Sequence, residues 1–350
     1  MKRFLSLLLI LVLLTGCSFA APTNTADTTP STTDSTLQVH FIDVGQADCA
    51  LLEYEDNAIL IDGGNVEDSS LVVSYLEQQG ITYLNLVVAS HAHEDHVGGL
   101  GGVLAVFETG AVWSPTTTYS SACFDDFMYY ADQQGLTVQI PKPGHKFTAG
   151  DLTLTVLGPT QSYADPNDTS IIIMVEFGQT RFLFTGDMET GAENDMLDYW
   201  GENFDWHADV LKVGHHGSDT STGYRFLNEV MPDHGVISVG EGNTYGHPCE
   251  EPLSRLRDAG VILYRTDELG TVTATSDGKE VTFTWEMQNA QPDDVEPGET
   301  VAVTYIGNKN SKKLHIDGCP SLPKEENRVY FDSYDEAIAE GYTPCSNCLD

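Results

Sequence analysis

The sequence predicts an α/β protein, a four-layer αββα sandwich that is followed by a small separate module. Two observations lead to this prediction. Each of two successive halves of the chain alternates apolar, strand-like runs with amphipathic, helix-like runs. In both halves, histidines and aspartates come directly after strand-like runs. Strands that alternate with helices form mixed sheets with helices on their faces, and two such halves are expected to pack sheet against sheet.

The first half begins near Leu37, where polar and apolar residues alternate as they do in strands. A serine at the start and Gly80 at the end bound an amphipathic run that is typical of a helix. The predicted strands are 37–44, 49–54, 57–64 and 83–90, and the predicted helices are 69–80 and 98–107.

The second half repeats the pattern up to Met287, which gives one domain over 37–287. Residues 288–300 hold two prolines and four acidic residues, which predicts a linker to a module at 301–350. The predicted strands are 151–159, 170–177, 180–187, 208–218, 234–240, 261–266, 271–277 and 281–287, and the predicted helices are 190–200, 223–230 and 252–260.

The N-terminus indicates export. Lys2 and Arg3 precede an apolar run that is too short to span a membrane comfortably, and the run ends in Leu-Thr-Gly-Cys17. Small residues before a cysteine are typical of a bacterial lipoprotein processing site, so 1–17 is predicted to be a lipoprotein signal peptide with Cys17 lipidated; an ordinary signal peptide is the alternative. Residues 18–36 are predicted to be a disordered tether. The protein is expected to be a cell-membrane lipoprotein that faces the extracellular side, without a transmembrane channel of its own.

The formal net charge of −37 over 350 residues restricts the partners. A field of this sign repels polyanions and argues against non-specific nucleic-acid binding, which needs Lys and Arg at the phosphates. It leaves room for a nuclease in which metal ions supply the positive charge locally.

The stretch SHAHEDHVGG at 90–99 crowds imidazoles and carboxylates into one turn. Neutral imidazoles and carboxylates are good ligands for zinc and similar divalent ions. His91 and His93 can point to one ion, and Asp95 and His96 can face a second. A solvated polar loop is the alternative reading.

A site for two metal ions needs a bridging carboxylate, and Asp187 follows an apolar strand-like run; a capping or turn aspartate is the alternative. Of His215 and His216, one could ligate and the other could donate a hydrogen bond to the substrate or leaving group, with His216 preferred as the ligand. His247 could close the site as a ligand or a substrate-binding group, or lie in a surface turn. The candidate catalytic residues are His215, His247 and Asp95.

Residues 37–287 resemble the metallo-β-lactamase superfamily, and more narrowly the metallo-hydrolase domain of the ComEC/Rec2 DNA-internalisation proteins. The matching stretches are FIDVGQAD, ILIDGG, SHAHEDHVGG, NDTSIIIMVEFG, FLFTGD, ADVLKVGHHGS, NTYGHP and YRTDELGTV. The resemblance implies an αββα fold, two zinc or manganese ions and hydrolysis by a metal-bound hydroxide. The implied ligands of one ion are His91, His93 and Asp187, and those of the other are Asp95, His96, Asp187 and one of the two histidines at 215–216.

Two further features concern the same site. Asp48 and Asp62 match strand-end acids of the family, and a role in orienting the ligand histidines fits them; a turn-forming aspartate is the alternative. Many hydrolases of the superfamily have another metal histidine between the first motif and the bridging aspartate. His145 does not match that position, and Asn167, Asp168 and Ser170 occupy the region. One ion is therefore expected to be held less tightly, with an open position for substrate.

The tail has the ligand spacing of a zinc site: His315, Cys319, Cys345 and Cys348. It resembles the Ada-type metal-binding module, which implies one structural zinc that stabilises a fold with too small a core. A pair of structural disulfides is the alternative, although three cysteines cannot form two bridges. A helix is predicted between the ligand pairs, at 332–341.

Together these features predict an exported, metal-dependent phosphodiesterase or nuclease that acts on DNA. A hydrolase of a cell-wall phosphoester, such as a teichoic-acid substituent, is the enzymatic alternative. A surface-binding protein without catalytic activity is the non-enzymatic one.

Overall fold

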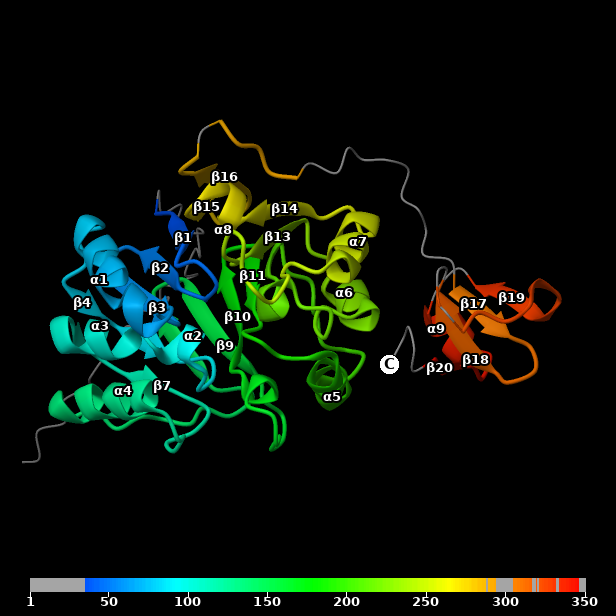
Figure 1. The fold of residues 1–350 in the computed structure, drawn as a ribbon, viewed down its shortest axis with the longest axis horizontal. Coiled ribbons are helices and arrows are strands. Elements are labelled where there is room, and N and C mark those ends of the chain that lie inside the picture. The colour runs from blue at the N-terminus through cyan, green and yellow to red at the C-terminus, as the bar shows by residue number, and fades with distance from the viewer. Residues whose placement is uncertain are drawn as a thin grey trace, which may run out of the picture. The chain divides into compact units, whose positions relative to one another are not determined.

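Two seven-stranded sheets face each other in the computed structural model, which describes residues 35–287, 289–293, 305–316, 319, 321–331 and 334–345. The strand order is β16-β15-β1-β2-β3-β5-β7 in the first sheet and β14-β13-β12-β11-β10-β9-β8 in the second. Helices cover the outer face of each sheet (Figure 1). The predicted four-layer αββα sandwich is therefore confirmed.

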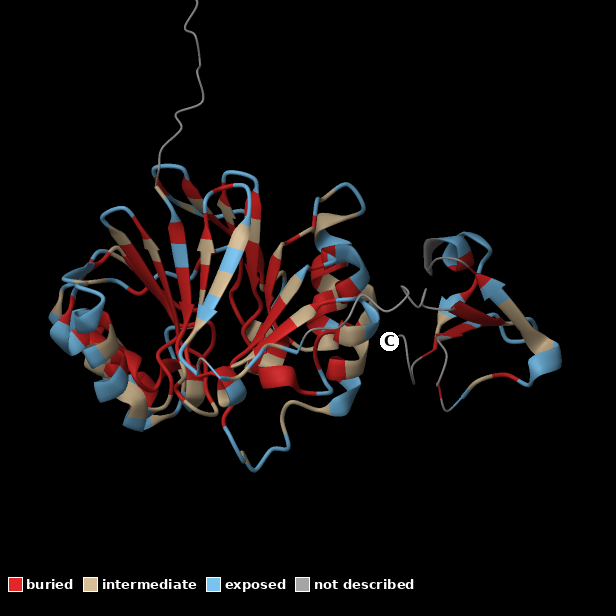
Figure 2. Cartoon of the chain, turned by 90° about the horizontal axis from the view of Figure 1, so that it is seen from above, coloured by how far each residue is buried: buried red, intermediate tan, exposed pale blue. Residues whose placement is uncertain are grey.

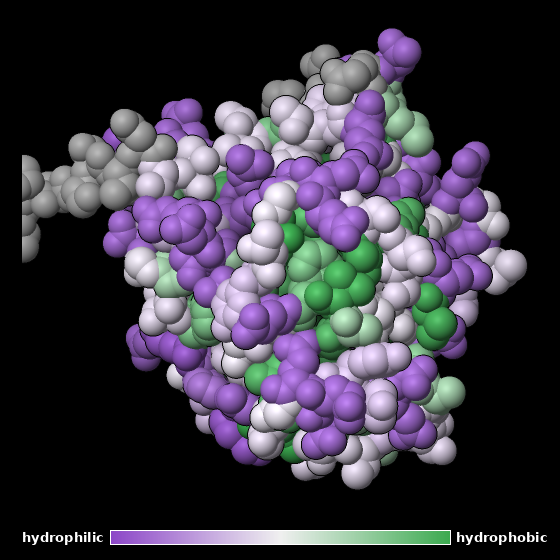
Figure 3. All heavy atoms as spheres, turned by 90° about the vertical axis from the view of Figure 1, so that its left-hand side faces the viewer, coloured by the Kyte–Doolittle hydropathy of each residue, from purple (hydrophilic) through white to green (hydrophobic). Residues whose placement is uncertain are grey.

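The first sheet combines N-terminal strands with two strands from the end of the domain. Its strands are β1 (Leu37–Phe41), β2 (Ala50–Tyr54), β3 (Asn57–Ile61), β5 (Leu86–Val88), β7 (Val112–Trp113), β15 (Val272–Ser276) and β16 (Val281–Trp285). Its helices are α1 (Ser69–Gln78), α3 (Leu100–Val106) and α4 (Ala122–Gln133), and the outer face of this helical layer is mostly polar around one apolar area (Figure 3). The strand predicted at 83–90 is in fact two strands, β4 (Tyr83–Leu84) and β5, because β4 leaves the sheet to pair with β6 (Glu108–Thr109).

The second sheet places four parallel strands side by side. Its strands are β8 (Lys146–Ala149), β9 (Leu152–Gly158), β10 (Ile172–Phe177), β11 (Thr180–Phe184), β12 (Val210–Lys212), β13 (His234–Ile237) and β14 (Ile262–Arg265). Its helices are α5 (Thr190–Trp200), α6 (Tyr224–Val230) and α7 (Glu250–Asp258). Because β11, β12 and β13 run parallel, the loops that follow them leave the sheet at the same edge.

The shorter helices are connectors. They are α2 (Glu94–Val97), α8 (Thr266–Leu269), η1 (Val66–Asp68), η2 (Asn167–Thr169), η3 (Gly214–Gly217) and η4 (Glu325–Asn327). Two of them, α2 and η3, carry histidines that the sequence predicts to bind metal.

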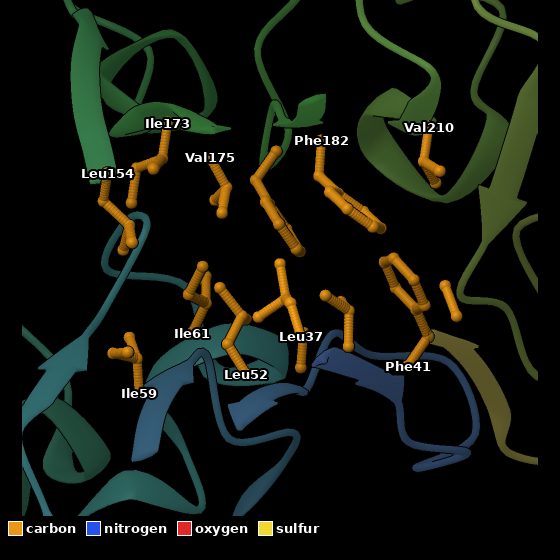
Figure 4. Close-up of a cluster of buried hydrophobic side chains, with 14 of the residues drawn as sticks. Leu37, Phe41, Leu52, Ile59, Ile61, Leu154, Ile173, Val175, Phe182 and Val210 are labelled. Carbon is orange, nitrogen blue, oxygen red and sulfur yellow. The ribbon is translucent and has the colours of Figure 1, made fainter. Parts of the chain in front are cut away.

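The main core lies between the two sheets. Side chains such as Leu52 and Ile59 of the first sheet point toward Val175 and Phe182 of the second (Figure 4). The inner faces of both sheets are buried (Figure 2). Burial of one such side chain contributes about 1.5–3 kcal/mol, so the two sheets are held together as a rigid base for the loops at their edge.

The C-terminal module has a sheet of its own with the strand order β19-β17-β18-β20. Its elements are β17 (Tyr305–Asn308), β18 (Lys313–Ile316), β19 (Arg328–Phe331), α9 (Tyr334–Ala339) and β20 (Thr343–Pro344). The helix predicted at 332–341 corresponds to α9. The apolar core of the module is small: Tyr305, Leu314, Phe331, Ala337 and Tyr342.

Several predictions fall outside the described residues. These are the signal peptide 1–17 with Cys17, the tether 18–36 apart from its last two residues, most of the linker 288–300, and Cys348. Over the part of the chain that the structure does describe, no helix combines the length and apolar character that crossing a membrane requires. The five cysteines described there are all free thiols.

Candidate metal centre

The loops after β5, β11 and β12 bring the predicted ligands to one edge of the sandwich. His91 and His93 follow β5, Asp187 follows β11, and His216 follows β12. The first two come from the first sheet and the last two from the second. Each ligand follows a buried apolar strand and lies in the loop that starts where that strand ends. Because these strand ends lie at one edge of the sandwich, the fold brings together residues that are distant in sequence.

The carboxylate of Asp187 is the point at which four imidazoles converge. Its Oδ2 lies 3.2 Å from Nε2 of His96 and 3.6 Å from Nε2 of His216. The Nε2 atoms of His215 and His91 lie 3.7 Å and 3.9 Å away. The rings therefore approach one oxygen from both sheets, which is the arrangement that a bridging carboxylate needs.

The other predicted ligands lie next to this point. Oδ2 of Asp95 is 3.4 Å from Nε2 of His216 and 4.0 Å from Nε2 of His96. Nδ1 of His93 is 3.1 Å from Nε2 of His91. All six predicted metal ligands are thus brought together, and His215 joins them from the same loop as His216.

Groups behind the ligands hold the imidazoles in this orientation. Nδ1 of His96 faces Oδ2 of Asp62 at 2.9 Å, and Oδ1 of Asp62 accepts a 2.6 Å bond from the backbone N–H of Ser90. Nδ1 of His216 lies 2.9 Å from the backbone oxygen of Ser238. A histidine whose Nδ1 donates in this way has Nε2 free for a metal ion.

Several atoms at the centre lack a hydrogen-bond partner within the described part of the chain. They are Nε2 of His96, Nε2 of His216 and Oδ1 of Asp187, and all three are buried. An unsatisfied buried polar atom costs about 1–3 kcal/mol. One ligand atom each from Asp95, His96, Asp187 and His216 lies within 4.8 Å of the others. Nitrogen and oxygen donors in such a cluster fit a divalent cation such as zinc or manganese.

The electrostatics also fit a cation. Burial alone would lower the pKa of His216, but the carboxylates of Asp187 and Asp48 outweigh burial and raise that pKa to about 10. Burial likewise would lower the pKa of His96, but Asp187 and Asp62 raise it well above its usual range. The carboxylates therefore create a negative potential where the Nε2 atoms meet, and that potential stabilises positive charge.

The loop Gly214–Gly217 has an unusual backbone. His215 (φ 49°) and His216 (φ 52°) are both in the left-handed region, which costs an L-residue about 1–2 kcal/mol. The backbone N–H of His215 donates to the oxygen of Gly186 at 3.0 Å, which ties this loop to the one that carries Asp187. The tight turn allows two successive histidines to reach the centre, and strain of this kind tends to gather at functional sites.

A cavity of about 350 Å³ opens onto the centre. The residues that line it are Gln46, His93, Glu94, Asp95, Asn167, Asp187, His215, His216, Tyr245 and His247. None of them is Lys or Arg. His247 lies over the cavity, with its ring centroid 5.6 Å from that of His215, and it is outside the ligand cluster. Asn243 shapes this loop by accepting from the backbone N–H of His247 at 3.1 Å.

Asp48 has a buried partner that no sequence motif indicates. Nζ of Lys212 lies 2.8 Å from Oδ2 of Asp48, and Oδ1 of Asp48 lies 3.3 Å from Nδ1 of His216. Lys212 and Asp48 are both buried. The position of Lys212 inside the apolar run 208–218 indicates that this lysine is buried. A buried charge requires a partner of opposite sign, so the sequence indicates that an acidic partner exists. Ser238 could not be found in this way, since it acts through its backbone oxygen.

A second metal-type cluster lies in the C-terminal module. His315, Cys319 and Cys345 are buried and their ligand atoms lie within 4.8 Å of one another. Nδ1 of His315 is 3.4 Å from Sγ of Cys319. One imidazole and two thiols fit zinc, which accepts both ligand types in structural sites.

Three family models match parts of the chain. Residues 42–241 match the model of the metallo-beta-lactamase superfamily, 302–350 that of the metal binding domain of Ada, and 1–18 that of the prokaryotic membrane lipoprotein lipid attachment site.

Similar proteins are known in bacteria. ComE operon protein 3 of Bacillus subtilis is 29% identical over 254 residues, covering 67% of this chain and 32% of that protein. Competence protein ComA of Neisseria gonorrhoeae is 30% identical over 235 residues, covering 66% of this chain and 31% of that protein. The chain thus spans about a third of the length of these curated relatives. The metallo-beta-lactamase fold protein YhfI of Bacillus subtilis aligns with a TM-score of 0.45 and 14% identity, over 72% of this chain and 100% of that one.

Proposed function

The chain belongs to the metallo-β-lactamase superfamily of metal-dependent hydrolases, and we propose that it is a phosphodiesterase that cleaves DNA. In this proposal the protein holds two divalent ions, zinc or manganese. The ligands of the first ion are His91, His93 and Asp187, and those of the second are Asp95, His96, Asp187 and His216.

The convergence of four Nε2 atoms on Oδ2 of Asp187 carries the proposal. A pair of divalent ions, when bound, supplies a nucleophilic water of lowered pKa and neutralises charge on a phosphoryl group. The protein would supply the geometry: Asp187 would lie between the two ligand sets, and Asp48 and Asp62 would orient the imidazoles from behind.

Three side chains would act on the substrate. His215 has its Nδ1 3.2 Å from Oγ1 of Thr220 and its ring at the cavity wall, so it can donate a proton to the leaving oxygen. Asp95 can accept the proton of the attacking water, and His247 can contact the substrate from above the cavity.

DNA is proposed as the substrate because the chain resembles the hydrolase domain of the ComEC/Rec2 DNA-internalisation proteins. The absence of Lys and Arg from the cavity lining implies that the ions carry most of the phosphate recognition. The same lining, with Glu94 and Asp95, favours one alternative, a cell-wall phosphoester whose other substituent is neutral or positively charged.

The proposal also includes the cellular location of the protein and the role of its C-terminal module. Lipidation of Cys17, within the matched attachment site, would hold the protein at the outer side of the cell membrane, where DNA or cell-wall polymer is accessible. In the C-terminal module, His315, Cys319, Cys345 and Cys348 would bind one structural zinc.

The test is hydrolysis by the purified protein, supplied with Mn²⁺ or Zn²⁺, of single-stranded DNA, double-stranded DNA and bis-p-nitrophenyl phosphate. Cleavage is expected for wild type and is expected to be lost in His93→Ala and Asp187→Ala. His145→Ala, an exposed histidine outside the cavity and outside every metal-type cluster of the described residues, is the matched control. The proposal fails if none of the three substrates is cleaved, or if cleavage persists in the His93 and Asp187 variants.

A further inference from the structure

Asn167 is a buried amide at the wall of the candidate metal centre. It begins η2, in the connection between β9 and β10, and it is 9% exposed. Its side chain lines the same cavity as His93, Asp187 and His215. Oδ1 of Asn167 is buried and has no hydrogen-bond partner within the described part of the chain.

The backbone holds Asn167 in a fixed relation to Asp187. The backbone N–H of Asn167 donates to Oδ1 of Asp165 at 3.1 Å. Its carbonyl oxygen accepts from the backbone N–H of Ser170 at 3.0 Å and from Oγ of Ser170 at 2.6 Å. Oγ of Ser170 in turn accepts from the backbone N–H of Asp187 at 3.1 Å. One serine therefore sets the position of Asn167 relative to the carboxylate on which the imidazoles converge.

A buried amide with an unsatisfied polar atom requires a partner, and the cavity is where that partner can come from. Gln46, the other amide in the lining, is already engaged: Oε1 accepts from the backbone N–H of Gly240 at 3.1 Å, and Nε2 lies 3.4 Å from Nδ1 of His247. A carboxamide can turn about its terminal bond and offer either an acceptor or two donors. Oδ1 is an acceptor, so a ligand that itself accepts hydrogen bonds requires the amide of Asn167 to turn and to present Nδ2 at the place that Oδ1 occupies.

The chemistry of the lining decides which face of the amide is used. Glu94, Asp95 and Asp187 are carboxylates and can only accept hydrogen bonds when ionised. Neither Lys nor Arg is present, so the donors of the lining are imidazole, phenol and amide groups. A phosphoester is an anion that needs donors on its non-bridging oxygens. Metal ions would supply charge without fixing the rotation of the phosphoryl group, and a rigidly held N–H donor would fix it.

We propose that Asn167 is a substrate-binding residue whose side-chain N–H donates to a non-bridging oxygen of the phosphoryl group. This inference rests on the proposed phosphodiesterase function. It adds a group from η2 that recognises the anion directly.

The test compares Asn167→Asp with wild type in the full-length, metal-loaded protein. Aspartate has the same shape, but its carboxylate only accepts hydrogen bonds and repels the phosphoryl group. We expect kcat/KM for bis-p-nitrophenyl phosphate to fall about 10²- to 10³-fold, which is the size of the effect of removing one donor to a developing oxyanion. The metal content, measured by inductively coupled plasma mass spectrometry, is expected to stay at the wild-type value.

A second readout does not depend on turnover. Inorganic phosphate is expected to raise the Tm of metal-loaded wild type, and this rise is expected to disappear in Asn167→Asp and to shrink in Asn167→Ala. Asn194→Asp on α5 adds the same charge outside the cavity and is expected to leave both readouts unchanged. If wild type cleaves no diester but shows the phosphate effect, the proposed function fails while the role of Asn167 stands.

Two outcomes would overturn the inference. One is an Asn167→Asp protein with wild-type kcat/KM and an unchanged response to phosphate. The other is an increase in the bound metal or its affinity in Asn167→Asp, which would identify Oδ1 as a metal ligand. Asn167→Ala covers the case in which the aspartate variant does not fold, because it removes the donor without adding charge.

Discussion

The ammonium group of Lys212 lies 2.8 Å from Oδ2 of Asp48, and the pair is buried directly behind His216. Removing one partner from a buried ion pair leaves an uncompensated charge and typically costs about 3–5 kcal/mol. Lys212→Met is therefore expected to lower the free energy of unfolding by about that amount, as measured by urea denaturation.

A surface pair provides the control for this prediction. Arg181 lies 2.9 Å from Asp205, whose side chain is 76% exposed. Ion pairs exposed to water contribute about 0–1 kcal/mol, so Asp205→Ala is expected to have a small effect. Equal losses in the two variants would show that the charge of Asp48 is already balanced without Lys212.

Substitution of Asp187 is expected to remove more metal ions from the protein than substitution of Asp95. If Asp187 bridges both ions, Asp187→Asn removes a ligand from each, and both are expected to leave the hydrolase site. Asp95→Asn removes a ligand from one ion only, so a single ion is expected to be lost. Metal analysis of the purified variants by mass spectrometry measures the difference. A full complement of metal in Asp187→Asn would contradict the bridging role.

The backbone strain at His215 predicts a variant that is more stable and less active. Glycine adopts the left-handed conformation without the cost that a Cβ atom imposes. His215→Gly is expected to raise the free energy of unfolding by about 0.5–1 kcal/mol and to abolish most of the hydrolysis. Thermal unfolding and a diesterase assay on the same sample test both parts.

Gly217 offers the reverse change in the same turn. Its φ is +80°, and a Cβ atom there would lie 2.6 Å from Cβ of Pro248. Gly217→Ala is therefore expected to destabilise the protein. If His215→Gly and Gly217→Ala changed stability in the same direction, backbone strain would not be the explanation.

Glu193 predicts a dependence of stability on pH. Burial raises the pKa of this carboxyl from 4.5 to about 7, although it accepts backbone hydrogen bonds from Thr222 and Gly223. A pKa that is higher in the folded state means that the folded state binds the proton more tightly. The contribution of Glu193 is thus most favourable below about pH 4.5, falls as the pH rises to about 7, and is constant above that.

The size of the effect follows from the shift. A difference of about 2.5 pKa units corresponds to about 3 kcal/mol. The free energy of unfolding of wild type minus that of Glu193→Gln is expected to fall by about this amount between pH 4.5 and 7.5, as measured by urea denaturation. A difference that is flat over this range would show that the two backbone N–H donors outweigh burial.

The C-terminal module is expected to depend on its metal. Cys345→Ser removes one thiol from the cluster of His315, Cys319 and Cys345. Native mass spectrometry is expected to show one zinc fewer than in wild type, with the hydrolase activity unchanged. Cys123→Ser, a buried thiol outside both clusters, is the control and is expected to retain every ion.

The sequence predicted the layers well, and it predicted residues that the fold brings together, because both depend on local patterns. Apolar alternation marks strands such as β1 and β9, and the crowding of His91, His93 and His96 has few explanations other than metal binding. The apolar run 208–218 indicates that Lys212 is buried, but no motif in the sequence indicates that its partner is Asp48. The split at Asn85 was missed because both β4 and β5 are apolar, and periodicity does not show where a strand changes its partner.

The helix α4 was missed for a different reason. Its N-cap is Ser121, whose side chain accepts from the backbone N–H of Phe124 at 3.3 Å, so a start signal was present. Acidic residues and tyrosines interrupt the apolar face, and only packing against α3 shows that Phe124 and Phe127 are core residues.

The meeting of both sheets at Asp187 has a consequence for maturation. The first half of the chain contributes His91, His93, Asp95 and His96, and the second contributes Asp187 and His216. A partly synthesised or partly translocated chain that ends before β11 lacks Asp187 and His216, so high-affinity capture of both ions has to wait until the second half of the domain has joined the first. Occupancy of the site would then report that the two halves have been assembled.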